Sequence, residues 1–209
     1  MYKFKYFTEE DTGTVIAFMK EYSFAVITGM DEQYPVATHV PLHIQRDEDK
    51  LFFTGHIMKN SDHHKAFLKN DNVLVIFNGP HCHVSAAWYP NPVQASTWNY
   101  ITVHAKGKIS FGDEPYTRKI VEDLTNTYED SNSPASFGKL PAEYIDRLVK
   151  AIVGFTIEVE SYDNVFKLSQ NHEPETRKSI IQHLGAGDSD EKKIAAEMEK
   201  RINIPKQSK

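Results

Sequence analysis

Apolar and polar residues alternate with two different periods along the chain. Between residues 9 and 22, Val15, Phe18, Met19 and Tyr22 recur at the spacing of one helix face. We expect this helix to start directly after Thr8, with acidic residues in its first turn, where the helix dipole favours negative charge. The same spacing, together with capping residues and prolines, predicts further helices at residues 61–70, 115–128, 141–152, 174–184 and 189–203.

Short apolar or alternating segments predict strands between these helices. They cover residues 24–28, 34–42, 51–57, 73–77, 83–88, 99–111 and 153–159. Gly107, within the longest of them, indicates a bulge or a sharp bend. Because strands two to five lack long crossover helices, they cannot form a parallel sheet. The pattern predicts a mainly β fold, a closed or split antiparallel barrel with flanking helices.

The length fits one domain with an appendage. The chain has 209 residues, 40% of them hydrophobic, which is enough for a substantial core. We expect residues 1–165 to form the barrel domain with inserted helices. Residues 166–209 are predicted to form a C-terminal helical extension that is not an independent domain.

Charge and cysteine content limit the partners and the compartment. Twenty-four basic and 29 acidic residues give a net charge of −5, which disfavours direct DNA binding and anionic membrane surfaces. We find neither a signal-peptide pattern nor an apolar run of transmembrane length, so we expect a soluble intracellular protein. The single cysteine, Cys82, excludes an intramolecular disulfide and a Cys-rich zinc site, in agreement with a reducing compartment.

Few catalytic motifs are present. The sequence contains no glycine-rich phosphate loop and no nucleophile elbow, so no catalytic residue is identified. Ten histidines are many for this length, and His81 with His83, like His39 with His43, share a strand face. That is the minimal geometry of a metal site. No carboxylate stands at a matching spacing, so no metal is predicted.

Two segments carry candidate ligand chemistry. Residues 55–61 place His56, Lys59 and Asn60 between a strand and a helix N-terminus, where donors gather toward a phosphate or carboxylate. An ordinary strand-to-helix loop explains this segment equally well. Trp98 and Asn99 lie at the start of the longest strand and suit a planar ligand, a subunit interface or core packing at the barrel end.

An ordered set of short motifs resembles the PaiB family, the FMN-binding negative transcriptional regulators. The motifs extend over nearly the whole chain and are Thr38-His39-Val40-Pro41, Thr54-Gly55-His56 with Lys59-Asn60, Gly79-Pro80-His81, Ser85 with Trp88-Tyr89-Pro90, Thr97-Trp98-Asn99-Tyr100 with Val103-His104, and Lys167-Leu168-Ser169-Gln170-Asn171. The resemblance implies a split β-barrel like that of pyridoxamine 5'-phosphate oxidase. It also implies a cytoplasmic homodimer with FMN in a cleft between subunits, linked to repression of sporulation and degradative-enzyme genes.

The motif positions assign roles to individual residues. His56, Met58, Lys59 and Asn60 are expected at the FMN phosphate. Where relatives often carry Arg, this chain has Lys59, a point charge without a bidentate fork. Residues 38–41 are expected along the isoalloxazine ring, with backbone groups at its pyrimidine edge; they are Thr38, His39, Val40 and Pro41. Trp98 and Asn99, from the same or the partner chain, are expected to close the slot.

Three functions remain open at this point. The resemblance implies a transcriptional regulator, but the last predicted helix carries Glu191, Glu197 and Glu199 among its lysines, unlike a DNA-reading helix. Regulation would then act through a partner or through redox state. The alternatives are a flavin-dependent oxidoreductase of the split-barrel class and a haem-binding or haem-degrading split-barrel protein.

Overall fold

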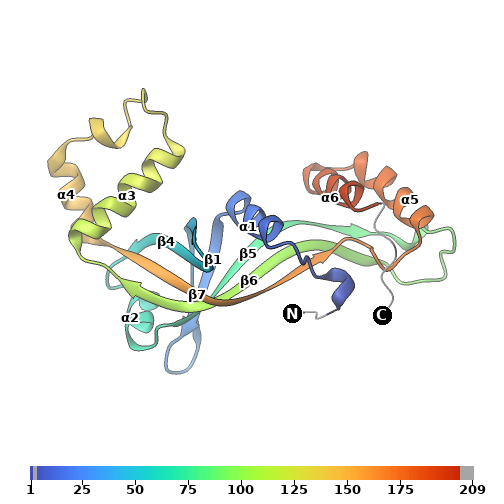
Figure 1. Cartoon of the computed structure of the whole chain (residues 1–209), viewed down its shortest axis with the longest axis horizontal. Helices are drawn as coiled ribbons and strands as arrows, with labels where there is room; N and C mark the ends of the chain where they lie inside the picture. Colours follow the sequence, from blue (N-terminus) through green and yellow to red (C-terminus); the bar gives the residue numbers. More distant parts are fainter. Residues whose placement is uncertain (2–3, 203–209) are drawn as a thin grey trace. The chain divides into compact units, whose positions relative to one another are not determined.

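The computed structural model describes residue 1 and residues 4–202 of the chain (Figure 1). Its strands are β1 (Phe24–Met30), β2 (Pro35–Pro41), β3 (His43–Asp47), β4 (Lys50–Met58), β5 (Asn72–Val84), β6 (Thr97–Phe111) and β7 (Ile152–Lys167). Its α-helices are α1 (Thr12–Glu21), α2 (Asp62–Lys69), α3 (Glu114–Tyr128), α4 (Ala142–Ala151), α5 (Pro174–Gly185) and α6 (Ser189–Lys200). Among these described helices, none combines the length and the apolar character needed to cross a membrane.

The strands form one antiparallel sheet whose two edges are consecutive in sequence. The strand order is β2-β1-β5-β6-β7-β4-β3. Only Leu42 separates the edge strands β2 and β3, so the sheet must curve until its edges approach each other. Because the edges stay unpaired, this geometry is that of a split barrel, as predicted.

The described chain divides into two compact units. The first comprises the described residues of Met1–Phe18, Asn78–Val103 and Asp163–Lys209, and the second comprises Met19–Phe77 and His104–Tyr162. The boundary that we placed at residue 165 stays a prediction.

The second unit carries the curved part of the sheet with helices α2, α3 and α4. Its core consists of inward-facing strand side chains. Among them, the rings of Phe53 and Phe77 pack edge to face, with 5.2 Å between the ring centres. The alternating burial of β4 and β5 follows the two-residue period of a half-buried strand.

The first unit carries α5 and α6, which pack against each other (Figure 1). Ile180, Leu184 and Ile194 are fully buried in this unit. Asp188 and Glu191 form a reciprocal capping box at the start of α6, which confirms the predicted helix start. The predicted end at residue 203 lies outside the described residues.

Three local predictions are wrong. The first helix starts at Thr12, because Asp11 caps it by accepting a 2.7 Å hydrogen bond from the Thr14 amide. Strand β3 was missed, since its exposed polar residues hide the alternation. Residues 83–88 are not a separate strand: β5 continues through Gly79 and Pro80 to Val84, and the single-turn helix η2 (Ala86–Trp88) follows.

Candidate flavin-binding site

The turn between β4 and α2 holds the residues predicted at the phosphate. Ser61 caps α2 by accepting a 3.3 Å hydrogen bond from the His64 amide, and its hydroxyl donates to the Met58 carbonyl at 2.9 Å. Asn60 adopts a left-handed φ of 64°, which turns the chain from strand to helix. The geometry brings Met58, Lys59 and Asn60 to one place, at the N-terminus of a helix.

His56 is the most unusual polar residue near this turn. Its Nδ1 atom is buried and has no hydrogen-bond partner within residues 1 and 4–202. Burial lowers the pKa of this imidazole below its usual 6.5, because the charged form loses hydration. A buried nitrogen without a partner is costly, so it is a place where a bound ligand could complete the hydrogen bonding.

Lys59 is held in place by the backbone of the α4–β7 junction. Its amide donates to the Ala151 carbonyl at 3.0 Å, and its ammonium lies 3.4 Å from the Val149 carbonyl oxygen. The ammonium makes no ion pair with a carboxylate in the described part of the chain. Lys59 is therefore a half-buried cation with its charge uncompensated.

The carboxylate of Asp62 at this turn would repel a bound anion. Asp62 occupies the first turn of α2, and hydrogen bonds from the His63 amide and ring lower the pKa of its carboxyl. Those bonds direct the Asp62 carboxylate toward His63, the next residue in the sequence. Asp62 nevertheless reduces the positive potential that the helix terminus would otherwise offer.

The residues predicted along the ring lie on β2, next to β4. Thr38 pairs with Ile27 and His39 with Val26, and His39 is exposed. A Cβ on Gly55 would come within 3.2 Å of the Pro41 carbonyl oxygen, so glycine lets β4 lie directly against the end of β2. The two predicted segments, one on β2 and one at the β4–α2 turn, therefore belong to one neighbourhood.

Trp98 and Asn99 lie in the first unit and differ sharply in exposure. Asn99 is fully buried; its side chain accepts a 3.1 Å hydrogen bond from the Ser169 hydroxyl and directs its amide nitrogen at the Met198 sulfur. Trp98 is 54% exposed, beside the rings of His81 and His83. Their predicted role in closing the flavin slot stays a prediction.

Cys82 is not an activated nucleophile. Burial, reinforced by the nearby carboxylates of Glu191, Asp188 and Asp190, raises the pKa of its thiol to about 12. At neutral pH the thiolate, which is the nucleophilic form, is negligible. Its side chain is buried, as is usual for a structural cysteine.

Comparisons with known proteins bear on this site. The family model described as "Putative FMN-binding domain" matches residues 1–161. The Protease synthase and sporulation protein PAI 2 of Bacillus subtilis is 31% identical over 199 residues, covering 95% of this chain and 96% of that protein.

Two solved structures share the fold at low sequence identity. The Flavocytochrome Anf3 from Azotobacter vinelandii has a TM-score of 0.58 at 14% identity and covers 79% of this chain and 72% of its own. The FAD and haem binding protein from Mycobacterium smegmatis has a TM-score of 0.57 at 13% identity, covering 77% and 73%.

The fold and the family match define a flavin-binding split-barrel protein. More narrowly, the chain belongs to the PaiB family, and its cofactor is FMN. The resemblance found in the sequence motifs is thereby confirmed.

The groups at the β4–α2 turn fit a flavin phosphate in kind. The turn offers an ammonium without a carboxylate partner in the described part of the chain and a helix N-terminus, and β4, which leads into it, carries the buried His56 nitrogen that has no partner there. The edge strand β2 adds backbone N–H and C=O groups, which the pyrimidine edge of an isoalloxazine ring requires.

Proposed function

We propose that this chain is a cytoplasmic, homodimeric, FMN-dependent negative regulator of transcription that acts without a DNA-reading helix of its own. The observation that carries the flavin part is the buried Nδ1 atom of His56, which has no hydrogen-bond partner among the described residues and lies on the strand that leads into the Lys59 turn. The regulatory part rests on membership of the family. The printed name of the Bacillus subtilis relative, which refers to protease synthase and sporulation, agrees with it.

The proposed phosphate contacts come from the β4–α2 turn. Lys59 supplies the positive charge, and the side-chain amide of Asn60 supplies a neutral donor at the helix N-terminus. His56 is neutral near pH 7, since burial lowers its pKa, so it contributes a hydrogen bond and no net charge. Met58, which is 58% exposed, offers apolar surface beside the phosphate end.

The proposed ring contacts come from β2. Thr38, His39, Val40 and Pro41 present the free edge of that strand, and the partner subunit's surface would cover the opposite side of the ring. When bound, FMN supplies electron-transfer chemistry through its ring system. The protein's own contribution is to bind, orient and shield it.

Indirect regulation follows from the charge of the C-terminal helices. α6 contains Asp190, Glu191, Glu197 and Glu199 against three lysines, and Asp188 caps its start. A helix entering the major groove must approach phosphates, which these carboxylates would repel. We therefore propose that a partner protein or the flavin's redox state transmits the signal.

Flavin rebinding tests the site. We would remove FMN from the purified protein and measure rebinding by flavin fluorescence for the wild type and for a His56→Ala/Lys59→Ala double variant. Loss of about 2–3 kcal/mol of binding free energy is expected, since a charge-assisted and a neutral hydrogen bond disappear. Lys192→Ala, an exposed lysine on α6, is the control. Unchanged affinity in the double variant would refute the phosphate assignment.

A gel shift and a molar-mass measurement test the remaining parts. The purified holoprotein should sediment as a dimer and should leave operator DNA unshifted at physiological salt. A specific shift would refute indirect action. Turnover of an electron acceptor with NAD(P)H would instead favour the flavin oxidoreductase alternative.

A further inference from the structure

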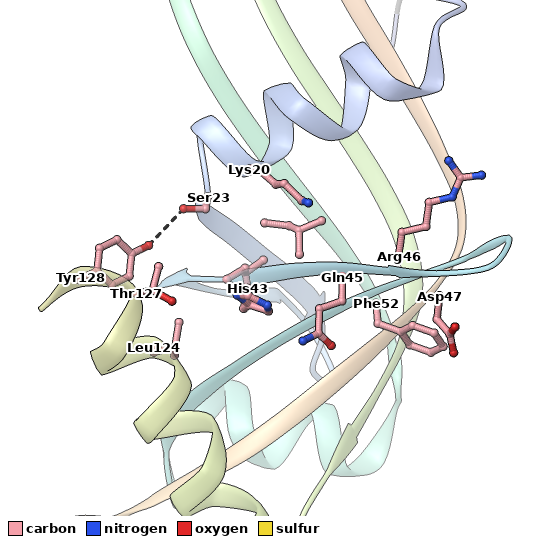
Figure 2. A pocket seen from close by; sticks show the side chains of 12 residues that line it. Lys20, Ser23, His43, Gln45, Arg46, Asp47, Phe52, Leu124, Thr127 and Tyr128 are labelled. Atoms are coloured by element: carbon pink, nitrogen blue, oxygen red, sulfur yellow. Dashed lines mark hydrogen bonds between the residues drawn. The ribbon is translucent and has the colours of Figure 1, made fainter. Parts of the chain in front are cut away.

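A pocket of about 750 Å³ lies in the second unit, beside strand β3 (Figure 2). Its volume is within the range of small-molecule sites. None of the residues proposed to bind FMN lines it. The lining residues come from the end of α1 and the chain that follows it, from Leu42, β3 and β4, and from the last turns of α3. Its polar residues include Lys20, Ser23, His43, Arg46, Asp47 and Tyr128.

The pocket follows a free strand edge. Within the described residues β3 pairs with β4 alone, and the register runs from His43↔Thr54 to Asp47↔Lys50. Asp47 and Lys50 flank a two-residue turn, so they form a hydrogen-bonded pair across the two strands. In an antiparallel ladder every second pair is of this kind, so Gln45 and His43 also bond to β4. The amide and carbonyl groups of Ile44 and Arg46 consequently point away from β4, toward the pocket edge.

One end of this edge is closed. The Ser23 hydroxyl and the Tyr128 hydroxyl lie 3.3 Å apart and link the chain after α1 to the end of α3 (Figure 2). Leu42, Ile44 and Leu124 are buried and supply apolar wall. A long strand could not run through this bridge, so the edge accommodates a short ligand.

The charges of the pocket favour an anion near Lys20. The Arg46 guanidinium is engaged at the opposite end, donating to the Glu48 carbonyl at 2.9 Å and lying 3.8 Å from the Asp49 carboxylate. Asp47 places a negative charge at that same end. The Lys20 ammonium makes no hydrogen bond or ion pair with any described residue, and it projects beside β3 in Figure 2.

We propose that this pocket binds a small carboxylate that also carries an amide and an apolar side chain, the chemistry of an N-acylated amino acid. The carboxylate pairs with Lys20 and the amide pairs with the free edge of β3 at Ile44 and Arg46. The apolar side chain packs against Leu124 and Phe52. This pocket shares no lining residue with the proposed FMN site, and the proposal does not depend on that site.

Titration of the ¹⁵N-labelled holoprotein with N-acetyl-L-leucine tests the proposal. We expect saturable shifts of the Ile44 and Arg46 amide resonances. N-acetyl-L-leucinamide, which lacks the carboxylate, and acetate, which lacks the amide and side chain, should each bind at least about fivefold more weakly. Flavin absorbance, recorded in parallel, should not change, which separates this outcome from failure of the FMN site.

Substitution of the lysine completes the test. Lys20→Gln should weaken N-acetyl-L-leucine about tenfold, because one charge-assisted hydrogen bond is lost. Lys178→Gln, an exposed lysine on α5, should bind like the wild type, and both variants should keep the wild-type amide spectrum. Three results would each overturn the proposal: equal binding of the leucinamide, shifts confined to other residues, or no shift at all, as when a second copy of the chain covers the β3 edge.

Discussion

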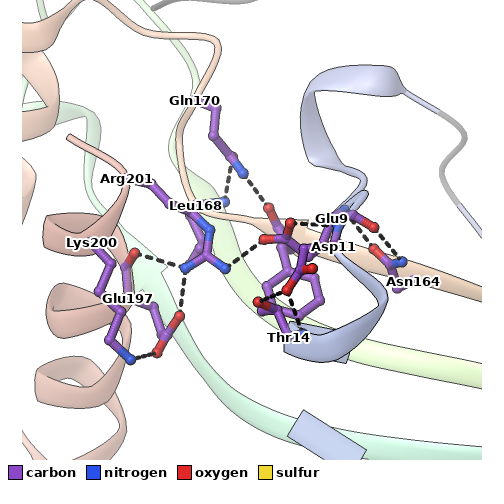
Figure 3. A network of polar contacts seen from close by, with 10 residues as sticks. Glu9, Asp11, Thr14, Asn164, Leu168, Gln170, Glu197, Lys200 and Arg201 are labelled. Atoms are coloured by element: carbon purple, nitrogen blue, oxygen red, sulfur yellow. Dashed lines mark hydrogen bonds and ion pairs between the residues drawn. The ribbon is translucent and has the colours of Figure 1, made fainter. Parts of the chain in front are cut away.

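Arg201 binds Glu9 across almost the whole length of the chain. Its Nη2 atom donates to the Glu9 carboxylate at 2.8 Å, and its Nη1 atom donates to the Glu197 carboxylate at 2.5 Å (Figure 3). The guanidinium also lies 5.2 Å from the centre of the Phe166 ring. Glu9 in turn is fixed by Asn164, which bonds both its amide and its carbonyl group. One arginine thus ties the segment before α1 to the end of α6 within the first unit.

Arg201→Ala should destabilise the protein by about 2–3 kcal/mol. The change leaves the carboxylates of Glu9 and Glu197, which are only 20% and 23% exposed, without their shared cation. Their partial exposure keeps the loss below that of a fully buried pair. Urea denaturation followed by circular dichroism measures it. Lys200→Ala removes an ammonium that is 68% exposed and should change stability little. Similar losses in both variants would contradict the prediction.

The stabilisation by Arg201 should disappear in acid. Burial alone would raise the pKa of Glu197, but hydrogen bonds from Lys200 and Arg201 outweigh it and hold the pKa below 4.5. A carboxyl whose pKa is lowered by folding stabilises the native state above its unfolded pKa, and this contribution is lost as pH falls through the folded value. The wild type and Arg201→Ala should therefore converge in unfolding free energy below about pH 4.

His56 should make the protein less stable in mild acid. Its folded pKa lies below 6.5, so the unfolded chain takes up a proton that the native state refuses. Stability should fall as pH drops below about 6.5. His56→Asn should show a smaller loss between about pH 7 and about pH 5.5, measured by urea denaturation. His39→Asn, at an exposed position, should retain the wild-type pH dependence. Equal slopes in all three proteins would argue against a buried neutral imidazole.

The sequence predicts elements well where local chemistry decides them. The Asp188–Glu191 capping box and Pro174 mark helix starts that the structure reproduces. Prediction fails where tertiary contacts decide. Gly79 and Pro80 look like a strand break, yet β5 continues through them, and glycine is needed at residue 79 because the Phe18 ring occupies the space in which a Cβ would lie. β3 is stabilised by its pairing with β4 and shows little apolar period of its own.

In the candidate site too, local motifs predict some features, whereas others depend on tertiary contacts. Motif order assigns residues 38–41 and 56–60 to the flavin as a prediction, and the close approach of Pro41 to Gly55 shows that the two segments are neighbours. The partnerless state of the His56 Nδ1 atom depends on packing from several strands and could not be read from spacing. The burial of Asn99 could not be read from spacing either, because its side-chain amide faces the sulfur of Met198, a residue of α6 that lies 99 positions later in the sequence.

Cys82 should resist alkylation in the native protein. Its thiol is 4% exposed and its pKa is raised to about 12, so neither access nor thiolate is available. Iodoacetamide at about pH 8 should leave the folded protein unmodified by mass spectrometry and should modify it fully in guanidinium chloride. Rapid labelling without denaturant would show that this part of β5 opens, and hydrogen exchange at residues 81–84 would then have to be fast as well.

Gly107→Ala should be among the most damaging small substitutions in the chain. A Cβ at this position would overlap the carbonyl oxygen of Glu158 on β7, a backbone atom that cannot rotate aside. Relieving the overlap requires β6 and β7 to separate locally, at an expected cost of about 2–3 kcal/mol. Gly138→Ala is the matched control, since nothing lies within 4 Å of a Cβ there, and it should be neutral or slightly stabilising because alanine reduces the entropy of the unfolded chain. Thermal and urea denaturation of both variants decide the matter, and a Gly107→Ala protein as stable as the control would mean that β6 and β7 approach each other less closely than the structure shows.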